Sequence, residues 1–147
     1  MLTKDAIVEY YPNGQLEWNI PIEWHVVGVY RRHGEAVQYY PTGEVKIRRT
    51  YKHGKEMGDE VMYYRDGSIM SRLTFKNGKK EGPYVFNHPD GSREEAAYEG
   101  GELKEGSIRH FDKDGKEKAR KNEILQRDRD TGAKKIMPGD HIPAHII

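Results

Sequence analysis

The chain has 147 residues, of which 35% are apolar and 33% are charged. This length suits one domain or one short repeat array, and the low apolar share disfavours a thick, two-layered core. A thin sheet buried mainly by aromatic side chains is favoured instead, and the 10 tyrosines suit that role.

Charge and cysteine content exclude several classes of function. The formal net charge is +1, so no overall field favours nucleic acid, and we expect no nucleic-acid partner. The chain has no cysteine, which rules out disulfides and thiolate metal sites. Residues 1–8 lack the apolar run of a signal peptide, and no stretch approaches the roughly 20 apolar residues needed to span a bilayer. We therefore expect a soluble, cytoplasmic protein, provided that no signal peptide has been removed.

The first hairpin is predicted after a short lead-in at residues 1–7. Tyr10 and Tyr11 precede an Asn13-Gly14 pair, which favours a type I′ turn, because both central positions of that turn need positive φ. The following segment, 15–27, is about five residues longer than its later counterparts. The first repeat is therefore irregular, as terminal repeats that cap an array commonly are.

Further copies of this pattern follow at an interval of 24 residues. The motif Tyr-Tyr-x-x-Gly occupies residues 39–43 and 63–67, and each copy leads through a second strand to a second glycine turn. The fourth and fifth copies keep the turn glycine and lose the tyrosine pair. The glycines fall into two interleaved registers: Gly34, Gly58, Gly82 and Gly106, and then Gly43, Gly67, Gly91 and Gly115. Such a period indicates a repeat architecture.

The C-terminal residues differ from the repeats. Residues 117–126 are charged and compatible with a short helix. The segment 121–147 carries sparse apolar residues and is broken by Pro138 and Pro143. Two alternatives stay open for this tail: a partly disordered terminus, or a segment that packs back on the sheet and covers apolar surface.

Together these features predict an all-β fold. We expect a single elongated, twisted antiparallel meander sheet of β-hairpin repeats, each about 24 residues long, with about ten short strands. The repeat domain is predicted to cover residues 1–120 with about five repeats. The predicted turn glycines are Gly14, Gly43, Gly67, Gly91 and Gly115. Positive φ is expected at Gly67, because Asp66-Gly67 closes a hairpin.

The tyrosine motif, together with Gly-Lys-x-x-Gly at 54–58 and 78–82, resembles the membrane occupation and recognition nexus (MORN) repeat. The resemblance covers about residues 8–120. It looks most like the bacterial variant, whose members are often described as antitoxins of toxin–antitoxin systems. The family serves as an interaction module in many settings, and in enzymes with such repeats catalysis generally belongs to a separate domain. The resemblance therefore implies a binding protein without an activity of its own.

Strand alternation predicts two different faces for the repeats. If the loops are the residue pairs 42–43 and 66–67, Tyr40 pairs with Val45 and Tyr64 with Ile69 on an apolar face. That face also carries Gln38, Ile47, Met62 and Leu73. The opposite face carries Val37, Val61, Met70 and the five candidate binding residues, which are Tyr39, Lys46, Arg48, Tyr63 and Arg72.

The mixture of tyrosine and basic side chains on this second face has two interpretations. The basic stems could cover tyrosine rings and shield a single-layer sheet, through cation–π contacts worth about 0.5–1 kcal/mol each. The same residue types are enriched at binding hot spots, so the face could instead be a contact patch for a partner.

The histidines and carboxylates do not form a recognised catalytic or metal-binding motif. His33 and His53 precede turn glycines, and His141 and His145 are separated by Pro143, which breaks a helical presentation. No nucleophile elbow, phosphate-binding loop or zinc-protease motif occurs. We therefore predict a non-enzyme with no catalytic residue, no metal site and no cofactor.

The leading hypothesis is a non-catalytic protein-binding repeat module. It would act like a bacterial antitoxin or immunity protein that sequesters another protein, such as a toxin. The alternative is a peripheral membrane or phospholipid-binding adaptor, although the near-neutral charge argues against a large basic surface. A cryptic hydrolase is a third hypothesis, which the missing motifs disfavour. The sequence does not indicate the oligomeric state.

Overall fold

The computed structural model describes residues 1–119, which form one antiparallel sheet of twelve strands. The strands are β1 (Ala6–Tyr10), β2 (Leu16–Val26), β3 (Val29–Arg32), β4 (Gly34–Tyr39), β5 (Val45–Lys52), β6 (Lys55–Glu56), β7 (Gly58–Tyr63), β8 (Ile69–Lys76), β9 (Lys79–Asn87), β10 (Arg93–Glu99), β11 (Glu102–Leu103) and β12 (Arg109–Phe111). The predicted all-β meander is confirmed. The count exceeds the expected ten partly because β6 and β11 are only two residues long.

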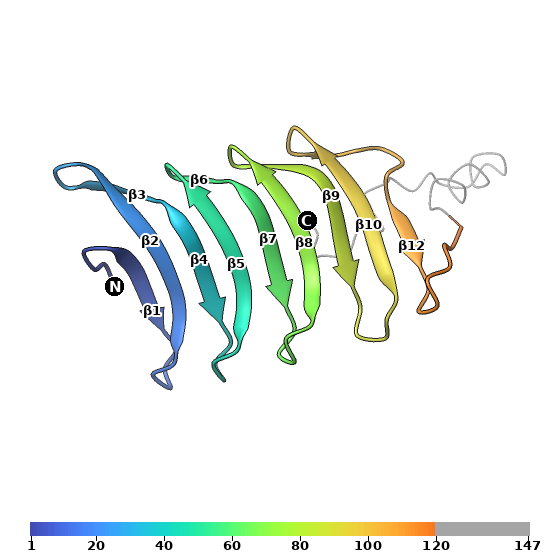
Figure 1. Ribbon diagram of the computed structural model, residues 1–147, viewed down its shortest axis with the longest axis horizontal. Coiled ribbons are helices and arrows are strands. Elements are labelled where there is room, and N and C mark those ends of the chain that lie inside the picture. The colour runs from blue at the N-terminus through green and yellow to red at the C-terminus, as the bar shows by residue number, and fades with distance from the viewer. Residues whose placement is uncertain (120–147) are drawn as a thin grey trace, which may run out of the picture.

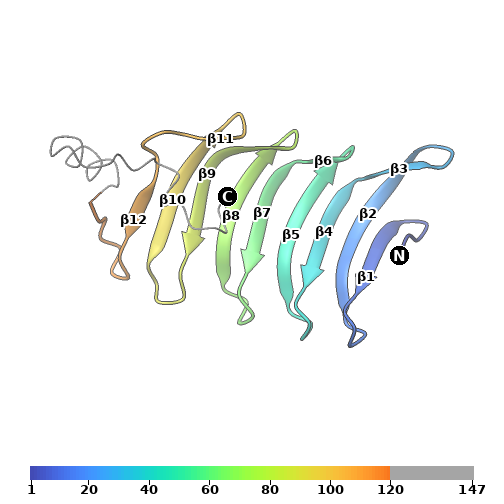
Figure 2. The same cartoon turned by 180° about the vertical axis from the view of Figure 1, so that it is seen from behind.

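Successive hairpins lie side by side in a single layer (Figures 1 and 2). The pairing order is β1-β2-β4-β5-β7-β8-β9-β10-β11, while β3 pairs with β2, β6 with β5 and β12 with β10. The described part of the chain contains no helix that is long and apolar enough to cross a membrane. The predicted tail at 121–147 and most of the possible helix at 117–126 lie outside the described residues, so the domain boundary after residue 120 stays a prediction.

Hairpin turns of two kinds form two rows, one at each end of the strands (Figure 1). We call the row that follows the tyrosine motifs the tyrosine edge, with turns at 12–14, 41–43, 65–67, 89–91 and 113–115. The other row is the opposite edge, with turns at 27–28, 53–54, 77–78 and 100–101.

Loops on the tyrosine edge have three residues. Gly67 N donates to the Tyr64 carbonyl at 3.0 Å, and Tyr64 N donates to the Ser68 carbonyl at 2.9 Å. This is a tight turn followed by a glycine bulge, in which only the glycine needs positive φ. The five predicted turn glycines have φ values of 87°, 103°, 87°, 93° and 83° in chain order. The positive φ predicted for Gly67 is therefore confirmed.

The type I′ turns lie on the opposite edge instead of at Asn13-Gly14. His53 and Asn77 are the described non-glycine residues with positive φ, at 50° and 51°, and each precedes a glycine that also has positive φ. Asn13 has no positive φ, so the turn predicted there is wrong. The physical reason is that the three-residue loop needs only one left-handed residue, and Gly14 supplies it.

The longer loops shift the strand register near the turns. Tyr39 pairs with Val45, and Tyr63 pairs with Ile69, so the expected pairing of the second tyrosine in each motif is wrong. A bulge one residue further on restores the predicted pairing of Gln38 with Ile47. The extra residues of the two bulges are Lys46 and Met70.

Beyond the bulges the two faces are as predicted. One row of cross-strand neighbours on the core face is Gln38, Ile47, Met62, Ser71 and Phe86. One row on the second face, which we call the charged face, is Val37, Arg48, Val61, Arg72, Val85, Glu95 and Arg109. Met70 was expected with the charged row, but the bulge frees it from strand alternation and it packs against the core cluster.

The core is thin and divided along the sheet. One cluster consists of Leu73, Tyr84, Phe86, Ala96 and Tyr98, and the other of Ile20, Ala36 and Tyr51. The rings of Tyr84 and Tyr98 meet edge to face at 6.4 Å between centroids. Burial therefore rests mainly on aromatic side chains, as the composition indicated.

Between the two clusters the core face carries a buried ion pair. Glu60 on β7 is 8% exposed and accepts a hydrogen bond from Arg49 on β5, which also donates to the Tyr51 hydroxyl at 3.2 Å. Burial opposes the charge of Arg49, but its bonds to Tyr51 and Glu60 outweigh that effect and raise its pKa. The sheet thus contains a charged contact where a uniform apolar stripe would also fit.

Candidate functional site

Two predicted binding residues from successive hairpins converge on one shallow depression. Arg48 on β5 and Tyr63 on β7 line it together with turn residues of the tyrosine edge. The other lining residues are Glu44, Val45, Arg65, Asp66 and Gly67. The depression therefore lies between two repeats and depends on both of them.

Both predicted arginines of the charged face are held by carboxylates. Arg48 donates to Glu35 at 2.6 Å, and Arg72 lies 3.4 Å from Asp59. The arginine side chains remain 43% and 50% exposed. Exposed pairs of this kind contribute about 0–1 kcal/mol, so both guanidinium groups can exchange their carboxylates for those of a partner at small cost.

Lys46 and Tyr39 do not join this depression. The bulge removes Lys46 from the paired row, and its Nζ lies 5.6 Å from the centroid of the Tyr40 ring. The Arg65 guanidinium lies 5.3 Å from the same ring. These contacts match the shielding interpretation for Lys46. Tyr39 is half-buried. It lies on β4, and β5 separates it from Tyr63 on β7.

Sequence reasoning missed the role of the second tyrosine in each motif. The hydroxyls of Tyr11, Tyr40 and Tyr64 donate to the carbonyls of Tyr39, Tyr63 and Asn87, at 2.7, 2.7 and 2.6 Å. Each bond joins one hairpin to the next. Burial raises the pKa of the Tyr11 and Tyr64 phenols above the usual value. The signal in the sequence was the periodic recurrence of this second tyrosine.

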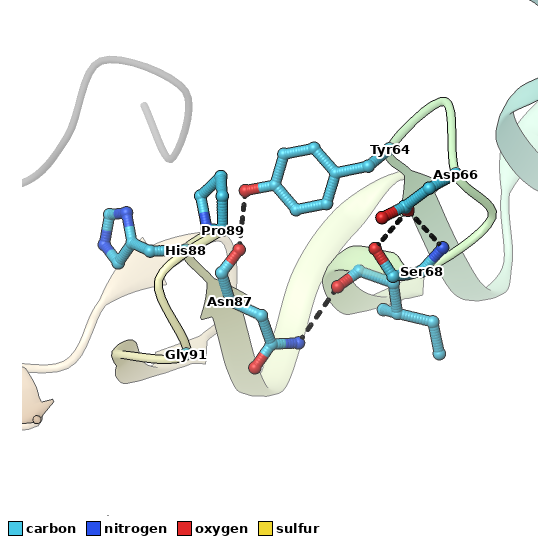
Figure 3. A pocket seen from close by; sticks show the side chains of 8 residues that line it. Tyr64, Asp66, Ser68, Asn87, His88, Pro89 and Gly91 are labelled. Carbon is cyan, nitrogen blue, oxygen red and sulfur yellow. Dashed lines mark hydrogen bonds between the residues drawn. The ribbon is translucent and has the colours of Figure 1, made fainter. Parts of the chain in front are cut away.

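A second depression lies one repeat further on (Figure 3). Tyr64 and Asn87 both line it, and the Asn87 side chain donates to the Ile69 carbonyl at 3.2 Å. Asp66 accepts hydrogen bonds from Ser68, which lower the pKa of its carboxyl group. These hydrogen bonds join the polar groups to one another and hold the turn in shape.

Two groups of histidine and glutamate were not foreseen. Glu23, His33 and His53 meet at the opposite edge, with one ligand atom of each within 4.8 Å of the others. Hydrogen bonds from His53 and Arg31 lower the pKa of the Glu23 carboxyl group. In the other group His88 and His110 approach the same oxygen of Glu94, at 3.6 and 3.5 Å. Both groups join residues far apart in the sequence, which spacing alone cannot reveal.

The β2–β3 hairpin exposes an apolar tip on the opposite edge. Val27 is fully exposed, and Trp24, Val26, Val29 and Tyr30 are each between 39% and 55% exposed. The Trp24 and Tyr30 rings pack edge to face at 5.6 Å. The longer first repeat that the sequence indicated is thus a hairpin that projects apolar side chains.

Comparison with known protein families gives a match for the two repeats that carry the Tyr-Tyr-x-x-Gly motif. A search of curated protein sequences found no match to this chain. MORN repeats are generally binding modules without enzymatic activity, which agrees with the open sheet and shallow depressions described above. Residues 32–53 and 58–77, which contain the hairpins β4–β5 and β7–β8, match the family of the MORN repeat variant.

Proposed function

We propose that the chain is a non-catalytic, protein-binding repeat scaffold whose contact surface is the charged face of β4, β5, β7 and β8. The observation that carries this proposal is the convergence of Arg48 and Tyr63, from successive repeats, on one depression. Arginine and tyrosine offer a large contact area and planar hydrogen bonding with little loss of side-chain entropy. The partner is a protein with an acidic or polar contact surface.

Sequestration of a toxin in the cytoplasm is the finer form of this proposal. It is supported by the resemblance of the tyrosine motifs to bacterial repeat antitoxins, and an open sheet face suits a blocking role. A partner encoded beside this chain and inactivated by it is the expected finding. The cytoplasmic location stays a prediction.

Affinity capture from the source organism tests the proposal. The full chain and its Tyr63→Ala and Arg48→Ala variants serve as bait, with mass spectrometry of the retained proteins. Arg109→Ala is the matched control, because Arg109 belongs to the same row but to the last hairpin. A partner retained by the wild type should bind each site variant about 1–2 kcal/mol more weakly, with unchanged melting, and should bind the control normally.

Two outcomes would overturn the proposal. Unchanged binding by Tyr63→Ala and Arg48→Ala, at temperatures where both stay folded, would leave these residues with the shielding role. Equal losses in Arg109→Ala would mean that the effect is not specific to repeats two and three.

A peripheral membrane adaptor is the second candidate, and the apolar β2–β3 tip favours it. Lys52, Lys55, Lys76 and Lys79 flank the next two turns of the same edge. An apolar tip beside basic turns suits the boundary between lipid headgroups and acyl chains. Sedimentation with phosphatidylserine vesicles should then depend on Val27, and Val27→Asp should abolish it. Vesicle binding that is absent, or unaffected by Val27→Asp, would exclude insertion of this tip.

A further inference from the structure

Two imidazoles and one carboxylate converge at the opposite edge of the first two repeats. Glu23 lies on β2, His33 lies between β3 and β4, and His53 lies in the turn between β5 and β6. His53 Nδ1 is 2.6 Å from Glu23 Oε1, and His33 Nδ1 is 3.8 Å from Glu23 Oε2. The two imidazole rings are stacked at 4.8 Å between centroids, with 26° between their planes.

The backbone of three separate segments holds this cluster in place. His33 N donates to the Pro21 carbonyl at 2.9 Å, and Gly54 N donates to the Arg32 carbonyl at 2.8 Å. His53 N donates to His33 Nδ1 at 3.1 Å. The side chains therefore meet because the strands are in register, and little further ordering is needed to bring their ligand atoms together.

Glu23 is oriented from one side only. Arg31 Nε donates to its Oε1 at 2.8 Å, the same oxygen that faces His53, and the Glu23 side chain is 29% exposed. Oε2 is the oxygen nearer to His33. The carboxylate thus faces the two stacked rings, with Oε1 directed to His53 and Oε2 nearer to His33.

The neighbouring repeat shows that the turn itself does not require a histidine. Asn77 stands one period after His53, with φ of 51° against 50°, and it also precedes a glycine with positive φ. Asparagine is among the residue types that best tolerate this backbone conformation. The presence of histidine at residue 53, stacked on His33, therefore points to a role of the imidazole and not of the turn.

We propose that Glu23, His33 and His53 bind a divalent cation of the zinc type. Two imidazole nitrogens and one carboxylate oxygen match the ligand preference of Zn²⁺, with water completing a tetrahedral site. Zn²⁺ binds such ligands at about 2.0–2.2 Å, and one ligand atom of each residue already lies within 4.8 Å of the others. Binding exchanges the His53–Glu23 and His53 N–His33 hydrogen bonds for bonds to the metal. This inference revises the sequence-based prediction of no metal site.

Calorimetric titration of the full chain with Zn²⁺ alone tests the inference. His141 and His145 are replaced by Asn in every protein compared, so that tail histidines contribute no binding. The site variants are His53→Asn, which copies the turn residue Asn77, and Glu23→Gln. The control is His88→Tyr, which removes another histidine and restores the tyrosine found one period earlier at Tyr64.

The parent protein should bind one Zn²⁺ and melt at a higher temperature when it is present, because a ligand of the folded state stabilises it. Loss of outer-shell partners alone weakens metal sites about 10–100-fold, so His53→Asn and Glu23→Gln should each weaken binding at least about tenfold. His88→Tyr should bind as the parent does. The inference is overturned if the parent does not bind Zn²⁺, or if folded His53→Asn binds as tightly as the parent.

Discussion

At the scale of single residues, the two tyrosines of each motif have different roles. The second tyrosine donates its hydroxyl to a carbonyl of the next hairpin, as Tyr64 does to Asn87. The first, Tyr39 or Tyr63, makes no hydrogen bond through its hydroxyl within residues 1–119. The second position therefore fixes the distance between repeats, and the first is available for contact.

Removing one of these hydroxyls should separate the two roles. Tyr64→Phe keeps the ring and leaves the Asn87 carbonyl without its donor, so we expect a loss of about 1 kcal/mol in the free energy of unfolding. Tyr63→Phe should change it by much less. Urea denaturation of both variants measures the difference. Equal losses would contradict the assignment of the inter-repeat bond to the second tyrosine.

Substitutions at Gly67 test the turn through backbone strain, without a steric clash. Its φ is 87°, and a Cβ placed there meets no atom within 4 Å, so a side chain would cause no clash. Gly67→Ala should cost about 1–2 kcal/mol, the penalty of a left-handed conformation for an L-residue. Gly67→Val should cost more, and Gly67→Asn less, because asparagine tolerates that region. Thermal melting measures these differences. Equal melting temperatures for Gly67→Val and the wild type would contradict this turn.

At the scale of elements, the sequence predicts where the strands turn better than how they pair. Periodic glycines locate the hairpins, since few other residues adopt positive φ. The choice between a two-residue and a three-residue loop depends on a single left-handed residue, and that choice moved the partner of Val45 by one position. Arg48 and Arg72 were still placed on the predicted face, because strand alternation resumes beyond the bulge residues Lys46 and Met70.

Local departures from the regular strand pattern also limited how well the sequence predicted the candidate site. Lys46 was misplaced because a bulge residue does not obey strand alternation. The Glu23–His33–His53 group could not be predicted, because it depends on how the irregular first repeat pairs with the second in the sheet. A sequence predicts which residues become neighbours across strands only where the repeat is regular.

The Arg49–Glu60 pair links β5 to β7 and should be costly to break from one side. Glu60→Leu leaves the partly buried Arg49 without its carboxylate, and removal of one partner from a buried pair costs about 3–5 kcal/mol. Arg49 is 27% exposed, so we expect the lower end of that range. The double variant Arg49→Met with Glu60→Leu should recover most of the loss, as seen by urea denaturation. A double variant as unstable as Glu60→Leu would mean that the pair itself stabilises the sheet.

At the scale of the whole molecule, the sheet behaves as a one-dimensional array. Each strand pairs only with its neighbours, and the two apolar clusters are built from different ends of the chain. Stability in such arrays is close to a sum of repeat and nearest-neighbour contributions. Deleting whole 24-residue periods should therefore leave a folded sheet, whereas deleting part of a period should not.

Deletion of residues 59–82, one full period, tests this directly. The deletion joins Gly58 to Pro83, and Gly58 and Gly82 have nearly equal φ, 82° and 80°, so the junction reproduces a native one. The rest of β9 can then pair with β5 as β7 does now, with Phe86 beside Ile47 in place of Met62. The Tyr40 hydroxyl would find the Asn87 carbonyl where the Tyr63 carbonyl was. We expect a folded β protein with a cooperative urea transition.

Deletion of residues 59–70 should have the opposite result. It removes β7 except Gly58, the turn that follows and the first two residues of β8, but leaves the rest of β8. Every later strand would then have to reverse its direction or exchange its two faces. Buried aromatic side chains such as Tyr84 would then point to solvent. Far-UV circular dichroism and urea denaturation compare the two proteins. If both deletions leave the same spectrum and the same cooperativity, the sheet is not organised by the 24-residue period, because only one of the two preserves the register.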